Sequence, residues 1–142
     1  MRILQKFELE VDADAAWRAL HSPAVMSELY GPLLRVESMA TAGMPVRWED
    51  GADAPVRYSS CGLGLGAHLM SVHDRHRVDS HGDVRILRDC GIPLTGPLAT
   101  LDVWDHQMAV SPVPGDPTRT LWRERLVIAG LTAPVLWGPL WA

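Results

Sequence analysis

Long runs that alternate between apolar and polar side chains fill much of the chain after its first quarter, and they limit what it can fold into. The clearest runs are residues 98–111 and 118–129, joined by the Pro- and Gly-rich segment 112–117. Strict alternation places successive side chains on opposite faces of a strand, and Pro-Gly-Asp segments favour turns. We therefore expect these two runs to form a long antiparallel hairpin.

Further strands are expected on both sides of this hairpin. Residues 2–11 alternate, with Ile3, Phe7, Leu9 and Val11 on the face predicted to be buried. Residues 68–78 and 83–90 are typical of a second hairpin that turns at 80–82. The remaining strand predictions are 33–40, 46–48 and 56–60; the turn at 50–53 either separates two strands or interrupts one.

Two short helices are predicted between the first strand and the others. Asp12 or Asp14 can accept hydrogen bonds from the free N–H groups of the first helical turn. The second helix would begin at Ser22 and Pro23 and end at Gly31. The apolar residues that these helices carry are Ala16, Trp17, Leu20, Val25, Met26 and Leu29.

Composition and charge exclude several classes of protein. The 142 residues carry 13 basic and 17 acidic side chains, for a net charge of −4, which argues against a basic nucleic-acid-binding face. No run of eighteen apolar residues is present, so no membrane-spanning helix is expected. The N-terminus lacks the apolar core of a signal peptide. We therefore expect a cytoplasmic protein with Cys61 and Cys90 reduced.

The predicted order is a strand, two short helices, a run of antiparallel strands and a terminal helix, which indicates an α+β fold in one domain, residues 1–142. That order and several segments resemble the SRPBCC (START-like, helix-grip) superfamily of polyketide cyclase and lipid-transfer relatives. The segments are 11–17 (VDADAAW), 22–23 (SP), 96–98 (GPL), 104–106 (WDH) and 120–126 (TLWRERL). The resemblance covers nearly the whole chain. It implies a curved antiparallel sheet of about seven strands around a C-terminal helix, with a cavity for an apolar or amphipathic molecule between them.

The C-terminal segment is shorter than the closing helix usual in that superfamily. Residues 131–142 would span only about 18 Å as a helix, and Pro134 and Pro139 interrupt it. Its large apolar residues are Leu131, Val135, Leu136, Trp137, Leu140 and Trp141. Left exposed, they would form an unusually apolar patch. We expect this tail to pack on the sheet of its own subunit or on that of a neighbouring subunit. In the second case the protein would be a homodimer.

Two polar residues interrupt the apolar face of the long hairpin. His106 falls between Trp104 and Met108 at strand spacing, and Glu124 follows Trp122 in the same way. A carboxylate beside an imidazole satisfies both groups when they are buried. Two interpretations stay open: an acid/base pair or ligand anchor at the cavity wall, or a structural hydrogen bond between strands.

Aromatic and methionine side chains on the same curved face would suit a wide apolar pocket for planar hydrophobic ligands. The predicted ligand-binding residues are Trp48, Tyr58, Met70, Arg88, Trp104, His106, Met108, Trp122 and Glu124. Because the strand register is not known from sequence, either Arg88 or Asp89 can be the residue that faces inward.

No metal or other cofactor is expected. Four histidines, His68, His73, His76 and His81, lie within fourteen residues, but their spacing on an alternating strand does not converge on one point. A solvated, mixed-charge strand surface, residues 74–77 (DRHR), is the favoured explanation. The glycine-rich segment 62–66 lacks the third glycine of GxGxxG and a following helix, so it indicates a bend or bulge and not a phosphate loop.

Three functions fit these observations. The first is binding of a small apolar or amphipathic molecule between the sheet and the C-terminal helix. The second is a cyclase/dehydratase-like or hydrolase-like enzyme with His106 and Glu124 as its catalytic acid/base pair. The third is a dimeric interaction module that has no small-molecule role.

Overall fold

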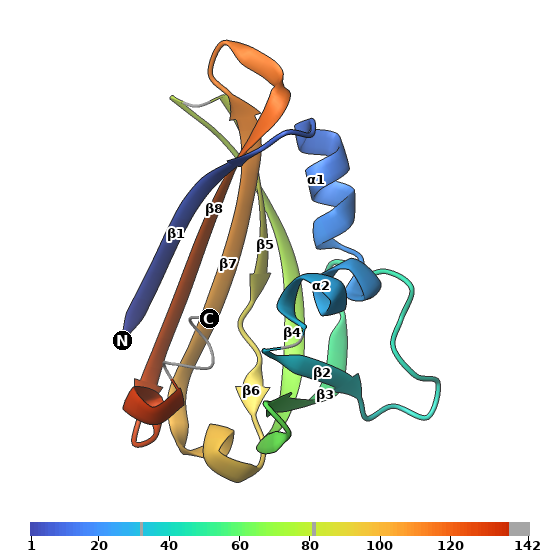
Figure 1. The fold of residues 1–142 in the computed structure, drawn as a ribbon, viewed down its shortest axis with the longest axis vertical. Helices are drawn as coiled ribbons and strands as arrows, with labels where there is room; N and C mark the ends of the chain where they lie inside the picture. Colours follow the sequence, from blue (N-terminus) through green and yellow to red (C-terminus); the bar gives the residue numbers. More distant parts are fainter. Residues whose placement is uncertain (32, 81, 137–142) are drawn as a thin grey trace.

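The computed structural model describes residues 1–31, 33–80 and 82–136. Strand β1 (Arg2–Leu9) is followed by helices α1 (Ala13–Leu20) and α2 (Pro23–Tyr30). The other elements are β2 (Arg35–Ser38), β3 (Asp53–Ser60), β4 (Leu63–Asp79), β5 (Gly82–Asp89), β6 (Ile92–Pro93), the 3-10 helix η1 (Gly96–Thr100), β7 (Leu101–Val113) and β8 (Asp116–Gly130) (Figure 1).

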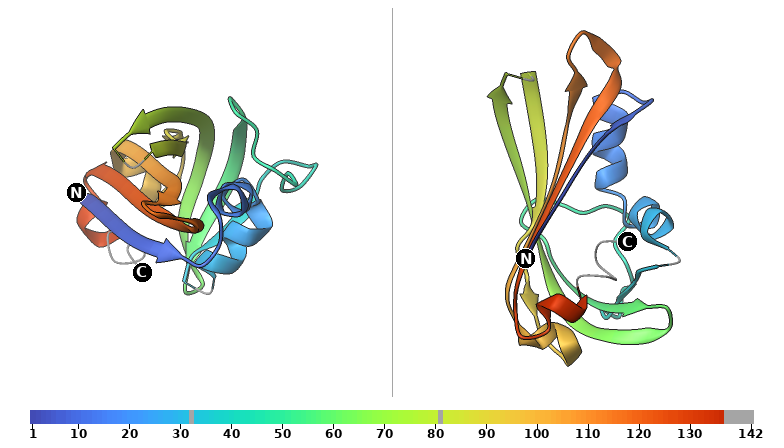
Figure 2. Two further views of the ribbon diagram at one scale, coloured as in Figure 1. Left: turned by 90° about the horizontal axis from the view of Figure 1, so that it is seen from above. Right: turned by 60° about the vertical axis from the view of Figure 1, so that its left-hand side comes forward.

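Within the described residues, eight strands form one antiparallel sheet in the order β1-β8-β7-β5-β4-β3-β2, with the short β6 beside β4. The sheet is strongly curved, and α1 and α2 lie on the same side of it (Figure 2). This arrangement confirms the predicted α+β helix-grip fold. It also confirms the long hairpin, formed by β7 and β8, although β7 begins at Leu101 because residues 96–100 form η1.

Side-chain caps start both helices where the sequence predicts them. The Asp12 carboxylate accepts a hydrogen bond from the N–H of Ala15 at 2.8 Å. The Ser22 hydroxyl accepts one from the N–H of Val25 at 3.4 Å, and Pro23 occupies the first position of α2. Each cap satisfies an N–H group that the helix itself leaves unpaired. Together they set where the chain leaves β1 and crosses the sheet.

The segment between β2 and β3 differs from the prediction. Residues 46–48 form no strand, and the whole connection 39–52 is irregular. The backbone N–H of Trp48 donates to the carbonyl of His21, at the junction of α1 and α2, over 2.8 Å. This bond ties the connection to the helices, while its end is bonded to β4, where the N–H of Gly51 donates to the carbonyl of Val72 over 2.8 Å.

Two positions expected on the buried face of the first strand, Phe7 and Val11, are exposed. Ile3 is buried, but Phe7 is 42% exposed and stacks on Trp122, with ring centroids 5.9 Å apart. Because β1 is an edge strand, Phe7 has a neighbouring strand on one side only. On α2, Leu29 is exposed as well.

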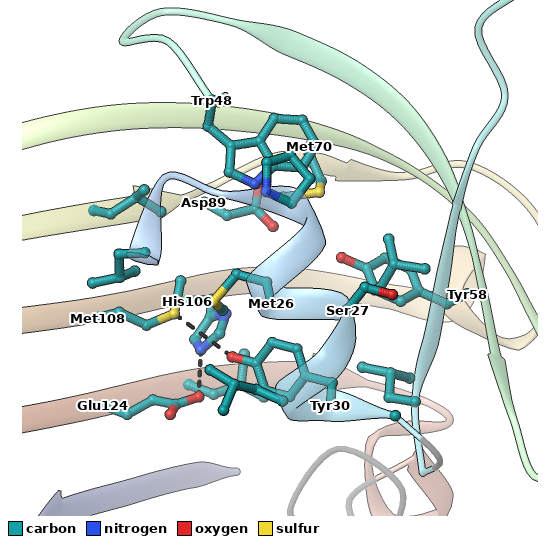
Figure 3. A pocket seen from close by; sticks show the side chains of 18 of the residues that line it. Met26, Ser27, Tyr30, Trp48, Tyr58, Met70, Asp89, His106, Met108 and Glu124 are labelled. Atoms are coloured by element: carbon teal, nitrogen blue, oxygen red, sulfur yellow. Dashed lines mark hydrogen bonds and ion pairs between the residues drawn. The ribbon is translucent and has the colours of Figure 1, made fainter. Parts of the chain in front are cut away.

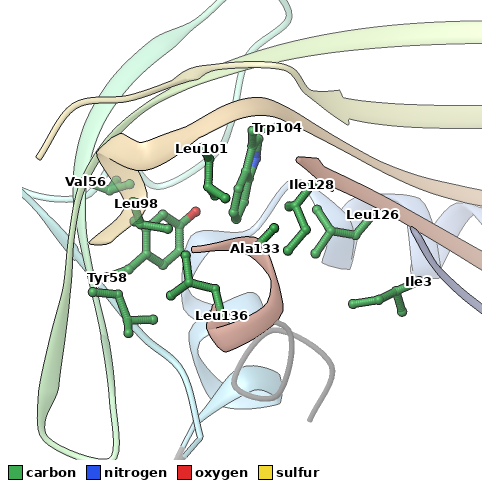
Figure 4. Close-up of a cluster of buried hydrophobic side chains, with 11 residues drawn as sticks. Ile3, Val56, Tyr58, Leu98, Leu101, Trp104, Leu126, Ile128, Ala133 and Leu136 are labelled. Carbon is green, nitrogen blue, oxygen red and sulfur yellow. The ribbon is translucent and has the colours of Figure 1, made fainter. Parts of the chain in front are cut away.

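The C-terminal tail packs on its own sheet as far as the structure describes it. Residues 133–136 are helical, and Ala133 and Leu136 are buried against Leu98, Leu101 and Ile128 (Figure 4). Leu131 and Val135 are exposed. The other large apolar residues of the tail, Trp137, Leu140 and Trp141, lie outside the described residues. The homodimer through this tail stays a prediction.

None of the helices in the described ranges is long and apolar enough to cross a membrane. The two cysteines are free thiols: Cys61 is exposed and Cys90 is half-buried.

Candidate functional site

A cavity of about 310 Å³ lies between the curved sheet and α2 (Figure 3). The sequence placed it beside the C-terminal helix, but none of the described tail residues 131–136 lines it. Helix α2 contributes Met26, Ser27 and Tyr30 from one side. The sheet and the β2–β3 connection contribute most of the residues that the sequence predicts: Trp48, Tyr58, Met70, Trp104, His106, Met108, Trp122 and Glu124. A mostly apolar wall with a few polar groups is typical of small-molecule pockets. The structure therefore brings these side chains together, while their role in binding stays a prediction.

Arg88 is the exception and corrects the prediction. It lies on the opposite face of β5, where its Nε donates to Oδ1 of Asp105 at 2.6 Å. That hydrogen bond raises the pKa of the guanidinium. Asp89, the next residue along the strand, faces the cavity instead. The register between β5 and β7 decides this, and it pairs Asp89 with His106.

His106 and Glu124 meet at the cavity wall, on adjacent strands (Figure 3). Nε2 of His106 donates to Oε1 of Glu124 over 2.7 Å, and the two side chains are only 14% and 17% exposed. Burial alone would lower the pKa of His106, but the hydrogen bond and charge of Glu124 outweigh it and raise that pKa above 6.5. Burial would likewise raise the pKa of Glu124, but His106 holds it below 4.5. The two groups thus stabilise each other's charged forms.

Asp89 is a second polar centre, 2% exposed. Its Oδ1 accepts from the N–H groups of Ser71 at 3.0 Å and Gly91 at 3.1 Å. Its Oδ2 accepts from Nε1 of Trp104 at 2.8 Å and Nε2 of His68 at 3.2 Å. Burial would raise the pKa of Asp89, but the hydrogen bonds from His68, Ser71 and Trp104 together lower it below 3.8. The carboxylate is therefore ionised although it is buried.

His68 is buried, whereas the mixed-charge segment 74–77 of the same strand is largely exposed, as expected. Its side chain is 0% exposed and packs against the rings of Tyr58 and Trp104. By contrast, His76 is exposed and pairs with Asp83, and His81 lies outside the described residues. In the part of the chain that the structure describes, no three His, Cys, Asp or Glu side chains are grouped as metal ligands would be.

Tyr30 and Met26 are cavity residues that the sequence reasoning did not select. The hydroxyl of Tyr30 donates to Sδ of Met108 at 3.6 Å, and burial, together with the charge of Glu124, raises its pKa. The phenol therefore remains a neutral donor. The two residues are four positions apart on α2, so they share one face of the helix. This spacing is the signal in the sequence that could have identified both as cavity residues. The sequence left the choice between Arg88 and Asp89 open, and the register selects Asp89.

No family model matches the sequence, and no curated protein matches it. Solved structures of other proteins are nevertheless similar. A hypothetical protein from Helicobacter pylori aligns with a TM-score of 0.61 and 12% identity, over 96% of this chain and 74% of that one.

Norcoclaurine synthase from Thalictrum flavum is similar in two structures. A point mutant in complex with a transition-state analogue has a TM-score of 0.57 and 12% identity, over 99% of this chain and 86% of that one. A complex with dopamine and hydroxybenzaldehyde has a TM-score of 0.53 and 13% identity, over 99% of this chain and 81% of that one. At such identities the likeness concerns the fold alone. The chain and these structures share the helix-grip fold.

Proposed function

We propose that this protein binds a small, largely apolar molecule in the cavity between α2 and the curved sheet. The observation that carries the proposal is the cavity itself, about 310 Å³ and lined mainly by apolar side chains, among them Phe, Tyr, Trp and Met residues. Its volume lies near the lower end of the range usual for ligand pockets, roughly 300–1,000 Å³. An aromatic molecule of one to three rings suits this size. Norcoclaurine synthase, which shares the fold, was solved with two small aromatic molecules, dopamine and hydroxybenzaldehyde.

Titration with N-phenyl-1-naphthylamine, an uncharged probe that fluoresces in apolar surroundings, tests this proposal. We expect a saturable rise in fluorescence with one site per chain. Met26 lines the cavity, whereas Glu28 on the same helix is exposed. Met26→Trp should weaken binding at least about tenfold because the larger ring fills the space that the probe needs, and Glu28→Trp should change it less than about twofold.

Thermal unfolding of both variants shows whether each retains the fold. Native mass spectrometry of the purified protein, beside its denatured mass, detects any molecule retained from the host. The proposal fails if the wild-type protein shows no saturable binding. It also fails if both folded variants bind the probe as tightly as the wild type.

Acid/base catalysis on the bound molecule is a second candidate, favoured by the His106–Glu124 pair at the cavity wall. An imidazole whose pKa lies above 6.5 can donate a proton near neutral pH and be held in place by the carboxylate. Once native mass spectrometry has identified a retained molecule, His106→Gln separates the two functions. An enzyme would lose turnover of that molecule, whereas a binding protein would show none to lose.

A further inference from the structure

The polar groups of the cavity are unbalanced in charge. Two carboxylates line it, Asp89 from β5 and Glu124 from β8, and His106 lies between them on β7. No lysine or arginine of the described residues lines it. The residues outside the described ranges contain neither type, since they are Pro32, His81 and the segment 137–142 (WGPLWA).

The nearby arginines lie on the other face of the sheet. Arg88 is hydrogen-bonded to Asp105, and Nη2 of Arg125 lies 4.0 Å from the same carboxylate. Arg123 donates to the hydroxyl of Ser111 at 3.1 Å. Because alternate residues of β8 face opposite sides, these cations are separated from the cavity by the thickness of the sheet.

Of the two carboxylates, Glu124 is the one that can accept a bond from a ligand. All four hydrogen bonds to Asp89 come from the protein, so both of its oxygens are already occupied. Glu124 accepts from His106 through Oε1, and its second oxygen has lone pairs for another donor. Asp89 contributes a fixed negative charge in a poorly solvated wall.

His68 does not cancel that charge within the cavity. It lies behind Asp89, fully buried, and is not part of the cavity lining. Its Nδ1 has no hydrogen-bond partner among the described residues. Even with His106 protonated, the three groups at the wall sum to a net negative charge.

We propose that the cavity selects molecules in which an apolar ring system carries a protonated amine bound by Glu124, and rejects those that carry a carboxylate. This inference rests on the proposed binding function and adds the charge of the ligand to it. The aromatic lining supports the same choice, because the faces of Trp and Tyr rings attract cations. An anion would instead meet Glu124 and Asp89 without any arginine or lysine to pair with.

Three indoles of similar size test this inference: tryptamine (cationic), tryptophol (neutral) and indole-3-propionate (anionic). We expect isothermal titration at neutral pH to show tryptamine binding about tenfold tighter than tryptophol, since a charge-assisted hydrogen bond replaces a neutral one. Indole-3-propionate should bind at least about tenfold more weakly than tryptophol. Glu124→Gln should make tryptamine and tryptophol bind about equally, because the amide keeps the shape but removes the charge.

Glu37→Gln is the matched control, because it removes the same charge from an exposed position on β2. It should leave all three affinities unchanged. If tryptophol binds but indole-3-propionate binds as tightly, or if Glu124→Gln leaves the preference for tryptamine intact, the charge inference is wrong while the binding function stands. If tryptophol and N-phenyl-1-naphthylamine both fail to bind, the binding function fails and the inference with it.

Discussion

At the scale of single residues, Asp89 combines a negative charge with an almost complete loss of contact with solvent. Such a group is tolerated only when its oxygens are hydrogen-bonded. Four donors surround it, from Ser71, Gly91, Trp104 and His68. These donors come from strands β4 and β7 and from the chain just after β5. Asp89 therefore joins parts of the sheet as well as facing the cavity.

Replacing Asp89 with alanine should destabilise the protein by about 3–5 kcal/mol, because four buried donors lose their acceptor at once. Urea unfolding followed by tryptophan fluorescence measures this change. Asp102→Ala is the control, since Asp102 is exposed on β7; it should cost less than about 0.5 kcal/mol. Equal midpoints for the two variants would show that the Asp89 network contributes little to stability.

At the scale of elements, the start of β4 and the segment before β7 approach each other at their backbones. The turn between β3 and β4 consists of Cys61 and Gly62, both with positive φ, and a register shift follows Tyr58. Gly66 lies within β4 at φ +127°, and a Cβ there would be 1.9 Å from the carbonyl oxygen of Thr95. The glycine-rich segment is thus a turn and bulge, as its sequence indicates.

Gly66→Ala should therefore cost more than about 2 kcal/mol, because the added methyl group meets backbone that cannot move aside and φ is unfavourable for alanine. Gly64 offers a matched control two residues away, since a Cβ there would have no atom within 4 Å. Gly64→Ala should change stability by less than about 1 kcal/mol. Chemical denaturation measures the free energy of unfolding of both variants. A similar loss of stability in each would contradict the close approach of the backbones at Gly66.

At the scale of the whole molecule, buried ionised groups make stability depend on pH. Glu124 and Asp89 have folded-state pKa values below their ordinary 4.5 and 3.8, so their contributions are complete above those values. They are lost as the pH falls through the folded pKa values. His106 has a folded pKa above its ordinary 6.5, so its contribution is complete below 6.5. It is lost as the pH rises through the folded value.

The free energy of unfolding should accordingly be highest between pH 4.5 and 6.5 and decline on both sides. Urea titrations at a series of pH values measure this profile. In His106→Gln the decline on the alkaline side should become shallower, whereas His76→Gln should leave the profile unchanged because His76 is exposed. A wild-type profile that is flat from acid to neutral pH would rule out this account of the His106–Glu124 pair.

The sequence by itself determined the order of the elements, the two helix caps and the face on which His106 and Glu124 lie. These are local properties: alternation, capping and turn chemistry each act over a few residues. The resemblance to the helix-grip superfamily rested on the same order of elements. Most of the predicted cavity residues share one face of the sheet for the same reason.

Only the tertiary structure decided what depends on distant parts of the chain. The register of β5 against β7 turned Asp89 inward and Arg88 outward, since a shift of one residue exchanges the faces. Packing against Tyr58 and Trp104 buried His68, although the segment 74–77 further along the same strand is largely exposed. The irregular connection that holds Trp48 over the cavity depends on a carbonyl in the junction between the helices. Packing across the sheet supplies these partners, and a pattern within one strand does not contain them.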